Sequence, residues 1–143
     1  MYCRQHTLVS TSRGISFRGA SHSKRRIVMA DKFSMQWHIT DRCDQRCKHC
    51  YIYEGKDKKC SLELDLNTLN LILEDFISSC KRLRKEPFLV ITGGDPLLYE
   101  GIWDFLEILK KNKIHFGLLG NPFHLNYDVV KKLEDLGCIN FQM

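Results

Sequence analysis

The chain alternates between segments patterned like β-strands and segments patterned like α-helices, and this order constrains its fold more than any other feature. Apolar residues that alternate or run continuously predict strands at 33–40, 88–92, 114–119 and 138–143. Apolar residues spaced by three and four positions predict helices at 66–83, 102–109 and 126–136. This order predicts an α/β fold, with a parallel sheet, right-handed crossovers and helices on the outside.

Residue types that favour helix ends support these boundaries. Asp65 or Asn67 can cap the first helix and Asn126 the third, because their side-chain oxygens accept hydrogen bonds from free backbone N–H groups. Gly137 follows the last helix, where glycine tolerates a left-handed backbone. Pro87 is expected to close the first helix, since proline cannot continue one.

Unusual segments follow each of the first three strands. Cys43, Cys47 and Cys50 form a CxxxCxxC pattern after the first strand, residues 93–96 read GGDP after the second, and residues 120–122 read GNP after the third. The C-terminal ends of parallel strands lie at one edge of a sheet, and this edge carries the chemistry of α/β barrels. We therefore expect the three segments to lie together there.

The cysteines allow more than one interpretation. A structural zinc site could combine them with His49 and Cys60, but no second cysteine pair stands at the usual spacing. A disulfide framework fits less well, because the chain has seven cysteines and no pattern of a secretory signal. Two further cysteines, Cys80 and Cys138, are expected to be small buried residues of a helix and a strand, whereas the role of Cys60, in a polar loop, stays open.

The third interpretation of the cysteines is that they hold an iron-sulfur cluster, and this interpretation suggests an enzyme. A cubane cluster has four irons, so three cysteine ligands leave one iron open to a small molecule. The first strand, the cysteine loop, Tyr51 after Cys50, and the GGDP segment together resemble the radical S-adenosylmethionine (radical SAM) enzymes over residues 33–143. The resemblance implies a 4Fe-4S cluster on Cys43, Cys47 and Cys50. It also implies that S-adenosylmethionine binds at the open iron and is cleaved reductively to a 5′-deoxyadenosyl radical.

The same resemblance implies a partial TIM-type half-barrel of parallel βα units. The chain is expected to hold the N-terminal portion of this core, at residues 33–143, and to stop after the start of the fourth strand. It would then be a fragment of a longer enzyme.

The GGDP segment is similar to the family's GGEP motif, whose backbone lies along the methionine part of the cofactor. The resemblance assigns this role to Gly93, Gly94, Asp95 and Pro96. Asp95 stands where the family usually has glutamate, which draws the carboxylate back by about one C–C bond, roughly 1.5 Å. A bulky residue at Gly94 is expected to weaken cofactor binding and to leave the cluster assembled.

Two further residues are candidates for cofactor contact. His49 precedes the third cysteine, where the family often has an aromatic residue near the adenine, and the alternative is an exposed loop histidine. Asn121 can bond the cofactor or serve as a turn residue before a proline. Trp103, Phe105 and Phe116 are expected in the core rather than at the cofactor.

Residues 38–43, 47–51 and 120–125 look most like the radical SAM maturases of ribosomally made peptides. This likeness implies a peptide or protein substrate and an electron donor such as a flavodoxin or ferredoxin. One alternative is an activase or sulfatase-maturase type of radical SAM enzyme that acts on a protein. The other is a non-catalytic iron-sulfur or zinc binding module.

Composition and charge argue against a membrane-spanning protein and against a nucleic-acid-binding protein. The chain is 43% hydrophobic and 27% charged, as in ordinary globular proteins, and it has no apolar run of about 18 residues, so a cytoplasmic protein without membrane spans is expected. The whole chain has a formal charge of +5, and residues 1–28 contain six basic and no acidic residues. The remainder is nearly neutral, so no nucleic-acid face is expected. Residues 1–28 are interpreted as a disordered basic leader, resembling a transit peptide, or as a spurious extension upstream of Met29.

Overall fold

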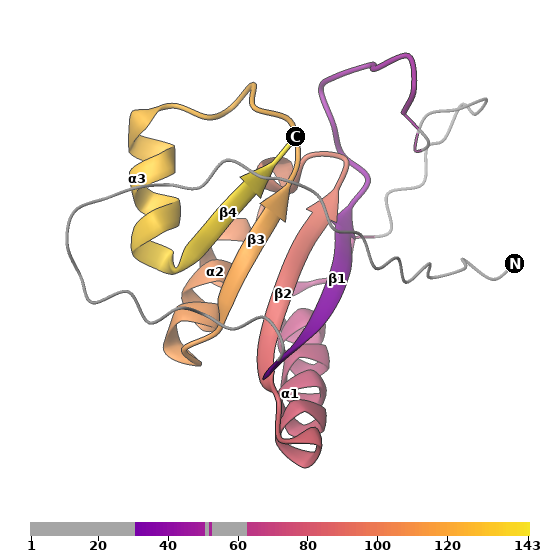
Figure 1. Ribbon diagram of the computed structural model, residues 1–143. Helices are drawn as coiled ribbons and strands as arrows, with labels where there is room; N and C mark the ends of the chain where they lie inside the picture. Colours follow the sequence, from indigo (N-terminus) through magenta and orange to yellow (C-terminus); the bar gives the residue numbers. More distant parts are fainter. Residues whose placement is uncertain (1–30, 51, 53–62) are drawn as a thin grey trace, which may run out of the picture.

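The structure is a computed structural model that describes residues 31–50, 52 and 63–143. Its elements are, in chain order, β1 (Lys32–Thr40), α1 (Leu66–Leu83), β2 (Glu86–Gly93), the short 3-10 helix η2 (Pro96–Leu98), α2 (Ile102–Lys111), β3 (His115–Leu119), α3 (Tyr127–Leu136) and β4 (Cys138–Gln142). The strands form one sheet in the order β1-β2-β3-β4, and every neighbouring pair is parallel (Figure 1). The predicted α/β fold, a partial half-barrel of βα units, is confirmed.

The helices pack on one face of the sheet, as right-handed crossovers require (Figure 1). In α1 the buried residues recur at three and four positions, because one stripe of the helix faces the core: Leu69, Leu73, Phe76 and Cys80. Two of the three aromatic residues predicted for the core, Phe105 and Phe116, are fully buried. The third, Trp103, is partly buried and packs against the core from its edge.

The predicted helix caps are largely confirmed. The side chain of Asp65 accepts a hydrogen bond from the backbone N–H of Thr68 at 2.9 Å, so Asp65 and not Asn67 caps α1. Asn126 caps α3 in the same way, and Gly137 follows it with a left-handed φ of 99°. Both ends of α3 therefore follow from its sequence.

The prediction that Pro87 closes the first helix is wrong. The helix ends at Leu83, because Arg84 takes a left-handed backbone with φ 54° and donates its N–H to the last carbonyls of α1. Pro87 lies instead within β2, opposite Phe33 of β1. A proline fits near the start of a strand, where its missing N–H costs least.

Two of the scattered cysteines behave as predicted. Cys80 and Cys138 are buried, and burial raises the pKa of the Cys138 thiol to about 11. Both are therefore neutral packing groups at ordinary pH. The predictions for residues 1–28, for Tyr51 and for Cys60 lie outside the described residues.

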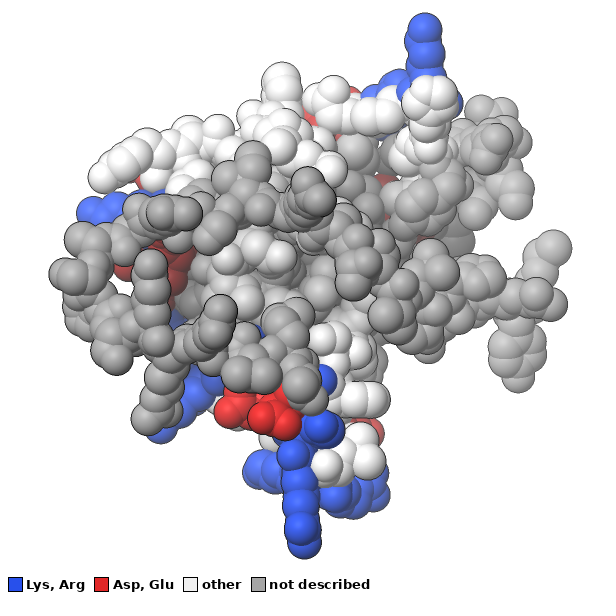
Figure 2. All heavy atoms as spheres, in the orientation of Figure 1, with Lys and Arg blue, Asp and Glu red and all other residues white. Residues whose placement is uncertain are grey.

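Basic and acidic side chains lie together at one end of the molecule. On the face drawn in Figure 2, described Lys and Arg side chains gather at the lower end of the molecule, with Asp and Glu side chains beside them. This end includes the last turn of α1, which carries Lys81 and Arg82.

Among the described residues, no helix is both long and apolar enough to cross a membrane.

Candidate metal centre

The three unusual segments meet at one edge of the sheet, where β1, β2 and β3 have their C-terminal ends (Figure 1). Two backbone hydrogen bonds join the first segment to the second: Gly94 N–H to the Thr40 carbonyl at 2.8 Å, and Asp95 N–H to the Arg42 carbonyl at 2.7 Å. The third segment reaches the first through Asn121, whose Nδ2 lies 3.7 Å from the sulfur of Cys43. The predicted meeting of these segments is confirmed.

The three cysteines lie on one loop, and their thiols are accessible. Cys47 is exposed, Cys43 and Cys50 are half-buried, and the Cys50 N–H donates to the Cys47 carbonyl at 3.0 Å, which closes a tight turn. The sulfur of Cys43 also accepts from the backbone N–H of Gln45 at 3.4 Å. Donors directed at a ligand sulfur tune the potential of an iron-sulfur cluster. The residues present therefore fit a cluster held by three thiolates.

The glycines of the GGDP segment have a role that sequence reasoning missed. A Cβ atom at Gly93 would lie 2.2 Å from the Thr40 carbonyl oxygen, and a Cβ at Gly94 would lie 2.2 Å from that of Arg42. Gly93 also has a φ of +153°, which residues with side chains rarely adopt. The two glycines let the chain that leaves β1 pass close to β2, directly before Cys43.

Asp95 is fully buried beneath this crossing. Its Oδ1 accepts the backbone N–H of Leu97 at 3.1 Å, which caps the short helix η2 that begins at Pro96. Its Oδ2 has no hydrogen-bond partner among the described residues. Burial raises the pKa of Asp95, and the nearby charge of Asp44 raises it further. The N–H of Leu97, the charge of His124 and the side chain of Asn121 offset this only in part. The shorter side chain that replaces the family's glutamate thus serves as a cap and also presents a free oxygen.

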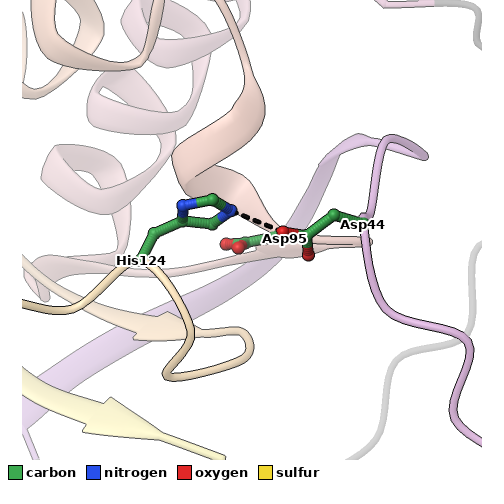
Figure 3. A group of neighbouring side chains, drawn as sticks. All are labelled: Asp44, Asp95 and His124. Atoms are coloured by element: carbon green, nitrogen blue, oxygen red, sulfur yellow. Dashed lines mark hydrogen bonds and ion pairs between the residues drawn. The ribbon is translucent and has the colours of Figure 1, made fainter.

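A carboxylate–imidazole pair lies next to Asp95 (Figure 3). Nε2 of His124, from the segment after β3, lies 2.7 Å from Oδ2 of Asp44, the residue after Cys43. Desolvation raises the pKa of Asp44, but the hydrogen bond and charge of His124 outweigh it and leave this pKa below its usual value. Sequence reasoning did not single out either residue, although both stand on loops predicted to meet.

The two weaker candidates for cofactor contact have different surroundings. The Oδ1 of Asn121 accepts the Phe123 N–H at 2.9 Å, so the turn interpretation of this residue is confirmed, while its Nδ2 faces Cys43. His49 is exposed, which agrees with its alternative interpretation as an exposed loop histidine. Cofactor contact by either residue stays a prediction.

An ion-pair network links the end of β1 and the residues after it to the segments that precede α1 and α2. Arg42 pairs with Glu63 through Nε at 3.0 Å and with Glu100 through Nη1 at 2.8 Å, and the hydroxyl of Thr40 donates to Glu63. Glu63 precedes α1 and Glu100 precedes α2, so three connections are linked beside the cysteine loop. The sequence contained no pattern that identified this network.

The parallel sheet and the three-cysteine loop at its C-terminal edge define an α/β domain with a candidate metal centre. Residues 37–143 match the Radical SAM superfamily, and the chain belongs to that superfamily. Its members use a 4Fe-4S cluster and S-adenosylmethionine.

Curated relatives have several activities. The chain is 28% identical over 100 residues to an S-adenosylmethionine-dependent nucleotide dehydratase of Fibrobacter sp., covering 65% of the chain and 28% of the relative. It is 23% identical over 101 residues to an Fe-coproporphyrin III synthase of Methanosarcina barkeri, covering 71% and 24%. A candidate glycyl-radical enzyme activating enzyme of Methanocaldococcus jannaschii is 28% identical over 108 residues, covering 76% and 38%. The chain thus spans well under half the length of these relatives, and no solved structure matches it.

Proposed function

We propose that this chain carries the cluster-binding part of a radical SAM enzyme, with a 4Fe-4S cluster held by Cys43, Cys47 and Cys50. The observation that carries the proposal is the joining of the cysteine loop to the GGDP segment by the hydrogen bonds of Gly94 and Asp95. A loop so fixed holds its thiols beside the motif that the family uses for the cofactor. When bound, the cluster supplies the electron that cleaves S-adenosylmethionine to methionine and a 5′-deoxyadenosyl radical.

The chain's own residues would bind and orient the cofactor. The backbone of residues 93–96 offers polar groups to the methionine part, and exposed His49 is free to stack on the adenine. The Nδ2 of Asn121 stabilises charge on the sulfur of Cys43, 3.7 Å away. These are binding and positioning roles, and the cofactors supply the electron and the radical.

We propose further that the substrate is a ribosomally made peptide and that a flavodoxin or ferredoxin supplies the electron. The likeness of residues 38–43, 47–51 and 120–125 to peptide maturases supports this choice. The named relatives are a nucleotide dehydratase, a porphyrin synthase and a candidate activating enzyme, so they favour no single substrate class. The activating enzyme is a reason to keep a protein substrate as the second candidate.

The first test is cluster assembly. Chain reconstituted with iron and sulfide without oxygen should turn brown and bind about four irons. Single Cys→Ala changes at positions 43, 47 and 50 should abolish this, whereas Cys80→Ala and Cys138→Ala, which remove core thiols, should not. Tight stoichiometric zinc without iron uptake would favour the binding-module alternative.

The second test is cofactor cleavage. The cluster-loaded protein, in this chain and in any longer natural form, is reduced with dithionite and given S-adenosylmethionine, with and without candidate peptides. Chromatography should then detect 5′-deoxyadenosine. If no form with a full cluster produces it, the catalytic proposal fails.

A further inference from the structure

The second cluster of metal-ligating side chains at this edge contains no cysteine. Asp44, Asp95 and His124 each direct one potential ligand atom to a common space, and these three atoms lie within 4.8 Å of one another (Figure 3). They come from three different loops, which follow β1, β2 and β3 respectively. The arrangement therefore depends on the folded sheet and not on one local motif.

Asp95 supplies an independent sign of a missing ligand. Its side chain is 0% exposed, its Oδ1 is used by the cap of η2, and its Oδ2 is buried with no hydrogen-bond partner among the described residues. Buried polar atoms in folded proteins are almost always paired, so an orphaned carboxylate oxygen requires an explanation. A cation beside it would provide the partner.

We propose that Asp44, Asp95 and His124 bind one divalent transition-metal ion, such as zinc, separate from any metal held by the cysteines. Two carboxylate oxygens and one imidazole nitrogen are ordinary ligands of such ions, at about 2.0–2.2 Å. Atoms around one ion are then roughly 3–4 Å apart, which the 4.8 Å limit of this cluster nearly meets. The two carboxylates also offset the charge of a divalent ion.

Binding would change the pair that is present without metal. His124 Nε2 and Asp44 Oδ2, now 2.7 Å apart, would move apart to roughly 3–4 Å as both turn to the ion. The imidazole must be neutral to ligate, so binding would release any proton it carries. Three protein ligands would leave at least one coordination position open. The ion would also tie the cysteine loop to the segments after β2 and β3.

The test uses the full chain with Cys43, Cys47 and Cys50 all changed to serine, so that it does not depend on the proposed iron-sulfur chemistry. This parent variant, freed of metal and kept reduced, is titrated with Co²⁺ and followed by its visible spectrum. We expect one equivalent to bind, with d–d bands and without the near-ultraviolet band of sulfur-to-cobalt charge transfer. Zn²⁺ should then displace the Co²⁺.

Ligand changes identify the site. His124→Ala, Asp44→Asn and Asp95→Asn, each in the serine parent, should weaken Co²⁺ binding by more than about tenfold, since loss of even an outer partner costs about 10- to 100-fold. The matched control is His38→Ala, because His38 and Asp41 form a similar pair at 2.6 Å. Asp95→Asn retains the oxygen that caps η2, and circular dichroism verifies that each variant is folded.

Two results would overturn the proposal. One is a folded serine parent that binds no stoichiometric Co²⁺. The other is Co²⁺ affinity that is unchanged by both His124→Ala and Asp44→Asn, or reduced equally by His38→Ala. Neither result bears on the proposed iron-sulfur cluster, because the serine parent lacks the three cysteines that would hold it.

Discussion

Replacing Gly94 with alanine tests how the structure places the cysteine loop. The added Cβ would lie 2.2 Å from the Arg42 carbonyl oxygen, 2.6 Å from its carbon and 2.8 Å from the Asp41 oxygen. All three are backbone atoms, so no side chain can rotate away. Relief to an ordinary contact of about 3.2 Å requires the two segments to separate by roughly 1 Å.

The cost can be estimated from the contacts that would be lost. Overpacking costs about 1–3 kcal/mol, and the hydrogen bonds from Gly94 to Thr40 and from Asp95 to Arg42 contribute about 0.5–1.5 kcal/mol each. A total of roughly 2–6 kcal/mol would lower the melting temperature by on the order of 10–20 °C. Because Cys43 follows Arg42, iron uptake should fall as well.

The assays are thermal unfolding by circular dichroism and iron content after reconstitution. Gly101→Ala is the matched control, because a Cβ there would meet only the side chain of Tyr99, at 3.0 Å. It should change the melting temperature far less. If Gly94→Ala keeps the melting temperature and the iron content of the unmodified chain, the close approach at Arg42 does not hold the loop. This expectation differs from the one drawn from sequence, in which a change at Gly94 would spare the cluster.

Three further outcomes are expected. Asp65→Ala should lower the melting temperature at neutral pH. The hydrogen bonds from Thr68 lower the pKa of the Asp65 carboxyl from 3.8. The difference in melting temperature between the two proteins should therefore persist above pH 3.8 and disappear as the pH falls through the lowered pKa, as melting curves at several pH values would show. Asn121→Ala should lower the midpoint potential of the reconstituted cluster, measured by redox titration, because it removes a donor to the ligand sulfur; an unchanged potential would contradict that contact. In metal-free native protein at pH 8, iodoacetamide should label exposed Cys47 and leave buried Cys138, whose pKa is about 11, unlabelled until the protein unfolds, and mass spectrometry of the peptides decides.

Much of the fold was predictable because its signals are local. The strands and helices lie where their apolar periodicity placed them, and Asp65, Asn126 and Gly137 occupy the cap positions that their side chains favour. Pro87 was misread because proline excludes a helix interior but does not specify which end or strand follows, and Arg84 ends α1 without a sequence signal. The sheet order then brought the cysteine, GGDP and GNP segments to one edge, as the strand–helix alternation predicted.

The contacts inside the candidate site required the tertiary structure. The resemblance of the sequence to a known family assigned Gly93 and Gly94 to the cofactor. Only the structure shows that the group packed against them is the chain's own backbone at Thr40 and Arg42.

The pairing of Asp44 with His124 joins residues 80 positions apart. The buried oxygen of Asp95 beside them depends on how three loops pack. Periodicity and capping act over a few neighbouring residues, whereas such contacts depend on strand register and loop path, which no short stretch of sequence encodes.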